Sequence, residues 1–167
     1  MSRKKTNSKI KELRNKISKK PGVIDKINTI DSIDDKFKID VLLVDDDKLN
    51  MLIYSKFLKN SGEISNVVEK TCPVDAMSYL TNLNEKNKVF PRLIILDIEM
   101  PVMNGLQFLK EFKKRFYRKN TKIILFTLHK ERYLKEELNQ QGVIGLLPKP
   151  FNTNLFKEMV NKNFRKK

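Results

Sequence analysis

Carboxylates that directly follow short apolar runs are the first feature of this sequence that could carry chemistry. The acidic run Asp45–Asp47 comes after Val41–Val44, and Asp97 comes after Leu93–Leu96. Clustered carboxylates repel one another unless a cation neutralises them, and Mg²⁺ prefers an octahedron of oxygen ligands that includes water or phosphate. A carboxylate can also attack phosphorus to form an acyl phosphate. Asp97 is therefore the candidate nucleophile of a magnesium-dependent phosphoryl site.

Two further side chains follow apolar runs and complement these carboxylates. Thr127 comes after Ile123–Phe126, and Lys149 comes shortly after Val143–Leu147. A hydroxyl and an ammonium group can stabilise negative charge on the oxygens of a transferring phosphoryl group. Short apolar runs suit strands that are buried on both faces of a parallel sheet, and ligands bind at the carboxyl ends of such strands. If the four runs are parallel strands, their ends bring these side chains together.

The rest of the chain alternates strands with helices, as an α/β sheet requires. Five strands and five helices are predicted, and right-handed crossovers then place helices on both faces of the sheet. The predicted strands are residues 38–44, 65–70, 93–96, 123–126 and 143–147. The predicted helices are residues 48–60, 73–83, a third that starts at Asn104-Gly105, 130–141 with Gly142 as its stop, and a last one that is capped within 152–154 and ends near 163.

Apolar residues at helical spacing predict which face two of these helices bury. In the helix at residues 48–60 the expected core face contains Leu49, Leu52, Ile53 and Leu58. In the third helix the expected inward residues are Leu106, Leu109, Phe112 and Phe116. The exterior of the third helix is basic, with Lys110, Lys113, Lys114, Arg115, Arg118 and Lys119. A solvated helix face is the default interpretation of these charges.

Length and composition suit one domain with a usable core and some additional chain. The sequence has 167 residues, of which 40% are hydrophobic. No apolar run approaches the ~20 residues that span a bilayer, and the N-terminus is too basic and polar to contain a signal-peptide core. A cytoplasmic protein is expected. Cys72 is the only cysteine, which excludes an internal disulfide and a cysteine-based metal cluster.

The net charge of +15 is shared between the N-terminal segment and the rest of the chain. Residues 1–20 contain nine Lys or Arg and one Glu, which gives +8, and residues 21–38 contain three Lys and four Asp, which gives −1. The remaining +8 belongs to residues 39–167. This balance could serve nucleic acid, acidic membranes or an acidic protein. A solvated basic surface is favoured, because no element that reads nucleic acid accompanies the charge.

Four segments taken together resemble the receiver domain of two-component response regulators. That family has Asp-Asp after the first strand, Asp-x-x-Met-Pro-x-Met-(Asp/Asn)-Gly after the third, Thr after the fourth and Lys-Pro after the fifth. Here these segments are Asp45-Asp46, Asp97–Gly105, Thr127 and Lys149-Pro150. Four motifs in series make a specific signal. The resemblance covers about residues 39–163 and implies a flavodoxin-like (βα)5 fold, a doubly wound parallel five-stranded sheet in the order 2-1-3-4-5.

The resemblance also implies a role for each site residue and a set of partners. Asp97 is expected to accept a phosphoryl group from a histidine kinase or a phosphotransfer protein. The expected Mg²⁺ ligands are Asp46, Asp97 and the backbone carbonyl of Glu99, with Asp45 contributing through water. Thr127 and Lys149 are expected to contact the phosphoryl oxygens, and the Lys149-Pro150 bond is expected to be cis. The protein would be a phosphoacceptor that catalyses at most its own phosphorylation and dephosphorylation.

Two positions depart from the commonest pattern of the family. The residue after the switch hydroxyl is usually small, but here it is Leu128, which could crowd the loop that moves toward the phosphoryl group. The aromatic switch position, three residues before the Lys, is Leu146. The usual coupled movement of Thr and an aromatic ring is therefore in question. The sole histidine, His129, is expected to lie at the surface.

The expected organisation is a receiver domain between two basic segments. Residues 1–38 form a basic N-terminal extension, either disordered or with a short helix at residues 8–19. Residues 39–163 form the receiver domain. Residues 164–167 form a basic tail with no room for an effector domain. The leading hypothesis is a single-domain response regulator that works in a phosphorelay and signals through contacts with an unidentified protein target.

Three other functions remain open at this point. A receiver-like domain can persist as a docking module that is never phosphorylated. A basic protein could bind nucleic acid through residues 1–20 and 110–122. A haloacid-dehalogenase-like phosphatase also uses an Asp nucleophile, Mg²⁺, Thr and Lys at strand ends. The last option is disfavoured because its Asp-x-Asp nucleophile motif comes first in the chain, whereas here the acidic pair Asp45-Asp46 precedes Asp97.

Overall fold

The structure is a computed structural model that describes residues 39–117, 119–128 and 142–165. Several predicted features lie outside the described residues. These are the extension at residues 1–38 with its possible helix, the helix at 130–141, Arg118, His129 and the last two residues of the basic tail.

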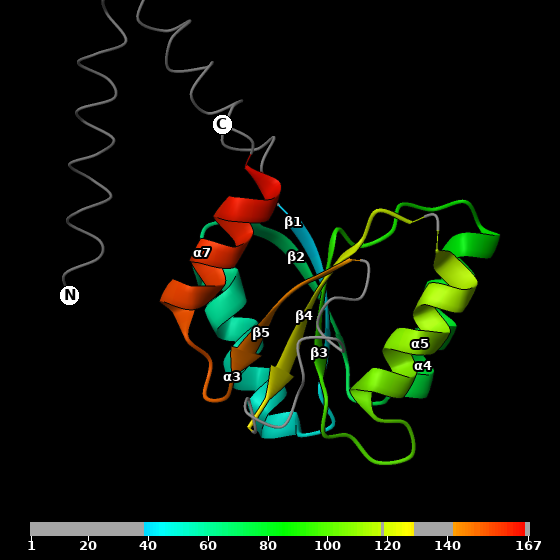
Figure 1. The fold of residues 1–167 in the computed structure, drawn as a ribbon, viewed down its shortest axis with the longest axis horizontal. Coiled ribbons are helices and arrows are strands. Elements are labelled where there is room, and N and C mark those ends of the chain that lie inside the picture. Colours follow the sequence, from blue (N-terminus) through cyan, green and yellow to red (C-terminus); the bar gives the residue numbers. More distant parts are fainter. Residues whose placement is uncertain (1–38, 118, 129–141, 166–167) are drawn as a thin grey trace, which may run out of the picture. The chain divides into compact units, whose positions relative to one another are not determined.

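A parallel sheet of five strands lies at the centre of the structure (Figure 1). The strands are β1 (Ile39–Val44), β2 (Ile64–Lys70), β3 (Leu93–Asp97), β4 (Lys122–Thr127) and β5 (Val143–Pro148). Their order is β2-β1-β3-β4-β5, and every neighbouring pair is parallel. The predicted flavodoxin-like fold and its strand order are therefore confirmed. Each predicted strand agrees with the observed one to within one residue at either end.

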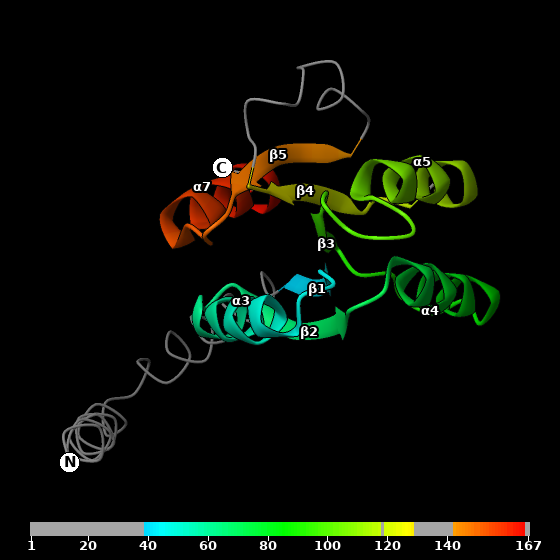
Figure 2. The same cartoon turned by 90° about the horizontal axis from the view of Figure 1, so that it is seen from below.

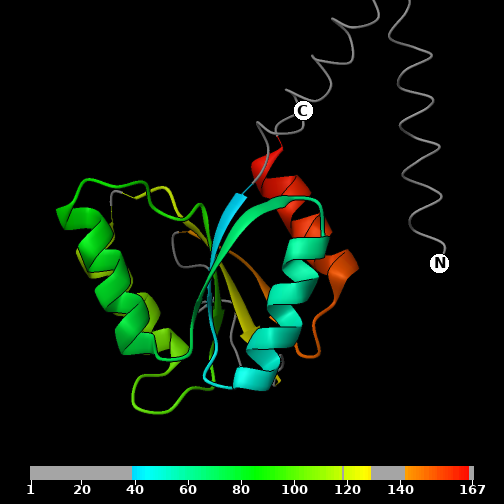
Figure 3. The ribbon, with the colours of Figure 1, turned by 180° about the vertical axis from the view of Figure 1, so that it is seen from behind.

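The helices cover both faces of this sheet. Figures 1 and 3 show one pair on each side. The four described helices are α3 (Lys48–Asn60), α4 (Pro73–Glu85), α5 (Gly105–Phe116) and α7 (Thr153–Phe164). Figure 2 shows that α3 and α7 lie on one face and that α4 and α5 lie on the other. This arrangement is the one that right-handed crossovers produce when the strand order reverses at β1.

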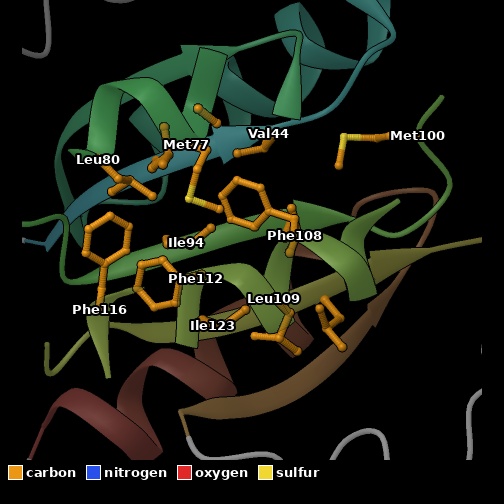
Figure 4. Close-up of a cluster of buried hydrophobic side chains, with 14 of the residues drawn as sticks. Val44, Met77, Leu80, Ile94, Met100, Phe108, Leu109, Phe112, Phe116 and Ile123 are labelled. Atoms are coloured by element: carbon orange, nitrogen blue, oxygen red, sulfur yellow. The ribbon is translucent and has the colours of Figure 1, made fainter. Parts of the chain in front are cut away.

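The two faces of the sheet form two separate hydrophobic cores. Successive side chains of a strand point to opposite faces, so Leu42 packs under α4 and α5 while Leu43 packs under α3 and α7. Figure 4 shows the first core, in which Phe108, Phe112 and Phe116 of α5 pack toward the sheet. Because both faces are covered, the central strands need apolar residues at every position, and this requirement explains the uninterrupted runs in the sequence.

One predicted helix face is wrong. The prediction that α3 buries Leu49, Leu52 and Ile53 fails, because their side chains are 65%, 67% and 40% exposed. The buried residues of α3 are Met51, Tyr54, Ser55 and Leu58. Both sets satisfy helical spacing, so periodicity alone cannot choose between them. The choice comes from packing, because Met51, Tyr54 and Leu58 belong to the core that α3 shares with α7.

Because α3 buries a different stripe from the predicted one, an apolar surface on α3 remains exposed, and we call it the α3 patch. It consists of Leu49, Leu52, Ile53 and Phe57, and the Phe57 side chain is 44% exposed.

The predicted inward face of α5 agrees better with the structure. Leu109, Phe112 and Phe116 are buried as expected, Leu106 is half-buried, and Phe108 is an additional fully buried residue.

Polar side chains cap three of the four described helices. The Asp47 carboxylate accepts hydrogen bonds from the backbone N–H groups of Leu49 and Asn50, at 2.8 and 3.2 Å. Asn104 forms a capping box with Gln107, and Asn152 accepts from Leu155, which confirms the predicted cap of the last helix. Helix α4 differs, because its N-cap residue is Cys72 and no side-chain hydrogen bond caps it.

A polar residue at position 72 should therefore stabilise the protein. The backbone of Cys72 is already extended, with φ −135° and ψ 127°, which is the conformation of an N-cap residue. Replacing Cys72 by Ser should add a hydrogen bond to the first turn of α4. We expect Cys72→Ser to raise the free energy of unfolding by about 0.5–1 kcal/mol, as measured by denaturant titration. Cys72→Ala is the control, and an equal gain in both variants would contradict the capping explanation.

Candidate functional site

Four of the predicted site residues meet at the carboxyl ends of the strands. In Figure 1 these ends lie at the lower edge of the sheet. Asp45 directly follows β1, Asp97 ends β3, Thr127 ends β4 and Lys149 directly follows β5. The pairing of β3 with β1 and β4, and of β4 with β5, brings these ends side by side. Asp45, Asp97 and Thr127 are buried, and the Lys149 side chain is only 8% exposed.

The ammonium group of Lys149 joins the two buried carboxylates. Its Nζ lies 2.6 Å from Oδ2 of Asp97 and 3.0 Å from Oδ2 of Asp45. The turn that carries Lys149 is fixed by a hydrogen bond of 2.7 Å from its backbone N–H to the carbonyl oxygen of Thr127. The Lys149-Pro150 bond is cis, as the resemblance implied. The ammonium group also lies 5.2 Å from the centre of the Phe126 ring.

Burial and charge act in opposite directions on these three groups. Burial raises the pKa of Asp45 and raises the pKa of Asp97 to about 6, although hydrogen bonds and the positive charge of Lys149 oppose both shifts. The negative charge of Asp45 adds to the shift at Asp97. For Lys149, burial opposes the charged form, but its bonds to Asp97 and Asp45 outweigh burial and raise its pKa. Lys149 therefore stays protonated at neutral pH.

Three carboxylates at this edge fit a divalent cation. Asp45, Asp46 and Asp97 each offer an oxygen, and these oxygens lie within 4.8 Å of one another. Opposite ligands of octahedral Mg²⁺ are about 4.2 Å apart, because each bond is about 2.1 Å long. The exposed carboxylate of Asp46 reaches solvent, so water can complete the coordination. The donor set therefore suits Mg²⁺, whereas coordination by the Glu99 carbonyl and by water on Asp45 stays a prediction.

The side chain of Glu99 has a contact that the sequence did not predict. The Thr127 hydroxyl donates a hydrogen bond of 2.6 Å to Oε1 of Glu99. The backbone N–H of Glu99 donates one of 3.1 Å to Oδ1 of Asp97. Residue 99 thus touches the candidate nucleophile with its backbone and the candidate switch hydroxyl with its side chain. The family resemblance singles out position 99, but no local sequence pattern indicates that its side chain reaches Thr127.

Gly105 lets the third helix start directly against the site. A Cβ atom at this position would lie 2.3 Å from the carbonyl oxygen of Asp97, which is far too close. The backbone N–H of Gly105 donates to the carbonyl oxygen of Ile98 at 3.0 Å. Only glycine allows α5 to approach the end of β3 in this way, so Gly105 fixes the backbone on which Asp97 is mounted. The sequence marks this glycine as part of a motif, but its steric role depends on how α5 packs against the end of β3.

The two unusual positions occupy different environments. The Leu128 side chain is 64% exposed, so it is not packed into the core. Leu146 is 6% exposed and belongs to the core beneath α4 and α5. The position that holds an aromatic ring in the commonest pattern is therefore filled here by a buried aliphatic side chain.

Taken together, the fold and the site define a phosphoacceptor module rather than an enzyme that turns over a small molecule. Residues 41–161, more than half of the chain, match the model of the response regulator receiver domain. The chain therefore belongs to the response regulator receiver domain family. Receiver domains as a family accept phosphoryl groups from histidine kinases.

Several known proteins are similar to this chain. The DNA-binding transcriptional regulator NtrC of Proteus hauseri is 30% identical over 115 residues, which are 69% of this chain and 22% of NtrC. The phosphate regulon transcriptional regulatory protein PhoB of Escherichia coli (strain K12) is 30% identical over 80 residues, which are 48% of this chain and 35% of PhoB. The chain thus spans about a third or less of the length of these relatives.

A solved structure of the chemotaxis response regulator CheY4 of Vibrio cholerae is similar in fold. It is 27% identical, with a TM-score of 0.59, and the match covers 75% of this chain and 98% of CheY4.

Among the described residues, no helix combines the length and the apolar character that crossing a membrane requires.

The raised pKa of Asp97 should make the metal-free protein less stable as the pH rises. The pKa of this carboxyl group is about 6 in the folded protein and 3.8 ordinarily, so the folded state binds the proton more tightly. The stability gained from that proton is complete below about pH 4 and is lost as the pH rises through about 6. The amide of Asn at position 97 does not titrate, so the Asp97→Asn variant lacks this contribution to the pH dependence of stability. We therefore expect the unfolding free energy of Asp97→Asn minus that of wild type to grow by about 1–3 kcal/mol across this window.

The measurement is denaturant unfolding in EDTA at a series of pH values. The two proteins share every other titrating group, so the difference isolates position 97 and its direct neighbours. Saturating Mg²⁺ should suppress the trend, because a cation favours the ionised carboxylate. A difference that stays flat or falls with rising pH in EDTA would contradict the raised pKa.

Proposed function

We propose that the protein is a single-domain response regulator of a phosphorelay, which accepts a phosphoryl group on Asp97 and then signals through protein contacts. The observation that carries this proposal is the buried Asp97 carboxylate bound by the Lys149 ammonium at 2.6 Å, beside two more carboxylates that fit Mg²⁺. Residues 39–163 would be the receiver domain. Residues 1–38 would be a basic extension and residues 164–167 a basic tail.

The phosphoryl transfer follows from the groups at the site. A carboxylate oxygen of Asp97 attacks phosphorus of a phosphohistidine, so an O–P bond forms and the N–P bond breaks. The imidazole nitrogen leaves with the electron pair of that bond and takes up a proton from solvent. Each oxygen of Asp97 accepts one hydrogen bond, one from Lys149 and one from the Glu99 backbone. Each oxygen has a second lone pair, which remains available for the attack or for a cation.

Lys149 and Thr127 would then hold the transferred group. The ammonium of Lys149 stays charged at neutral pH and can turn from Oδ2 of Asp97 to a phosphoryl oxygen. The Thr127 hydroxyl can donate to a second oxygen. When bound by Asp45, Asp46 and Asp97, Mg²⁺ would neutralise the clustered carboxylates and the incoming negative charge.

Phosphorylation should depend on Asp97 and on a divalent cation. After incubation with acetyl phosphate and Mg²⁺, we expect the intact mass of the wild type to increase by one phosphoryl group. Asp97→Asn and samples with EDTA should show no gain. Asp75→Asn is a matched control, because it removes an exposed carboxylate at the start of α4. Beryllofluoride binding by the wild type would distinguish a rapidly hydrolysed product from a protein that is never phosphorylated.

Two results of the acetyl phosphate experiment would contradict phosphorylation at Asp97. An equal mass gain in Asp97→Asn would place the phosphoryl group on another residue. No gain and no beryllofluoride binding would favour the second candidate, a receiver-like docking module that works without phosphorylation. That candidate is supported by the buried Leu146, since it provides no aromatic ring for the usual switch.

We also propose that the phosphoryl donor binds at the α3 patch. The patch starts two residues after Asp47, so it adjoins the opening of the site. Phe151, which follows Lys149-Pro150, stacks on Phe57 with ring centres 5.7 Å apart, so the turn that carries Lys149 borders the same surface. Exposed Lys48 and Lys56 lie on the same helix as the patch. A helix with an apolar stripe and acidic flanks is the partner that this surface fits.

A charge in the α3 patch should therefore slow transfer from a protein donor but not from a small molecule. For any kinase or phosphotransfer protein that phosphorylates the wild type, Leu52→Glu should lower the transfer rate at least about tenfold, because a buried unpaired charge is costly. Phosphorylation by acetyl phosphate should be unchanged. Val89→Glu is the matched control, since Val89 is an exposed apolar residue in the loop between α4 and β3. Equal losses in both variants would argue against this docking surface.

A further inference from the structure

We propose that Glu99 is a positioning residue that competes with the phosphoryl group for the hydroxyl of Thr127. This inference rests on the proposed function, because it concerns the step in which Thr127 turns toward a group on Asp97. We call the hydrogen-bonded pair Glu99–Thr127 the latch. In the unphosphorylated protein the latch is closed, with 2.6 Å between Oγ1 of Thr127 and Oε1 of Glu99.

The geometry of the latch comes from two neighbouring strands. Thr127 is the last residue of β4, and Glu99 lies two residues beyond the last residue of β3, which is the neighbour of β4 in the sheet. The backbone of this segment is anchored, because Ile98 donates to the carbonyl oxygen of Phe126 at 3.0 Å. The backbone N–H of Glu99 donates to Asp97 as well. These bonds hold the Glu99 side chain beside β4, within reach of the hydroxyl.

Glu99 and a phosphoryl group compete because the Thr127 hydroxyl has only one proton. A threonine hydroxyl has a single proton to donate, so it cannot serve Glu99 and a phosphoryl oxygen fully at the same time. Its bond to a carboxylate is charge-assisted and therefore stronger than a bond between neutral groups. Thr127 is also β-branched and fully buried, so few rotamers are open to it. Closing the latch thus stabilises the state in which the hydroxyl is turned away from a phosphoryl group.

The exposure of Glu99 limits the strength of the latch. Glu99 is an exposed residue, so its charge is not buried when the hydroxyl leaves. Opening therefore costs part of a hydrogen bond and not the burial of a charge. The expected effect is an approximately tenfold change in the equilibrium, which is enough to tune the switch without blocking it. Glu99 would then set how readily this receiver enters its activated state.

Beryllofluoride tests the latch without the complication of hydrolysis. Its dissociation constant would be measured by calorimetry at saturating Mg²⁺ for wild type, Glu99→Gln and Glu99→Ala. We expect about tenfold tighter binding for Glu99→Ala, because the competitor is removed. Glu99→Gln should lie between the two, since its amide oxygen still accepts a hydrogen bond but carries no charge. Both variants keep the backbone N–H and carbonyl of residue 99.

A second set of variants separates the latch from simple charge repulsion. Thr127→Val removes the hydroxyl and keeps the branched shape, and it is combined with Glu99→Ala in a double-mutant cycle. If the latch acts through the hydroxyl, Glu99→Ala should change beryllofluoride affinity less than about twofold in the Thr127→Val background. The same gain in both backgrounds would overturn the latch, because Glu99 would then act only through its charge.

Two further results distinguish failure of the proposed function from failure of the latch alone. Failure of wild type and all variants to bind beryllofluoride would overturn the proposed function and the latch together, whereas binding with additive effects would overturn the latch alone. The same cycle is measured on unfolding in the absence of Mg²⁺ and beryllofluoride. A coupling between Glu99 and Thr127 is expected there, and its absence would mean that the latch does not close in the resting protein, which would overturn the proposal.

Discussion

The site depends on one electrostatic constraint, which is that two buried carboxylates must share a cation. Asp45 and Asp97 lose hydration when the sheet buries them, and this burial raises the pKa of each carboxyl group. The Lys149 ammonium compensates both at once, at 3.0 and 2.6 Å. Removing one partner of such a group leaves an uncompensated buried charge, so the three residues act as a unit.

The architecture serves to bring these three residues together. They come from parts of the chain that are about 50 residues apart in sequence from one to the next. Parallel strands place their carboxyl ends at one edge, and two separate cores hold the strands in register. Gly105 adds a steric condition, since any side chain there would collide with the backbone of Asp97. Small changes in packing near β3 would therefore move the carboxylate itself.

The surroundings of the site differ between the two faces of the sheet. On the face of α4 and α5, position 146 is a buried leucine. On the face of α3 and α7, aromatic rings lie close to the site, because Phe126 beneath Lys149 meets Tyr54 at 4.6 Å and Phe151 at 6.1 Å between ring centres. Phe151 in turn stacks on Phe57 of the α3 patch. A chain of aromatic rings therefore links the candidate site to the surface that we propose for the phosphoryl donor.

The sequence by itself determined the fold class, the strand order through the family resemblance, and the set Asp45, Asp46, Asp97, Thr127 and Lys149. It could do so because buried parallel strands need continuous apolar runs and because the polar residue after each run must lie at the same edge. Only the tertiary structure decided which stripe of α3 is buried, since two stripes have the same helical spacing. It also decided the partners of Lys149, the bond between Glu99 and Thr127, and the steric role of Gly105. Contacts between strands depend on distances across the sheet, and those distances are not encoded in the local pattern of either segment.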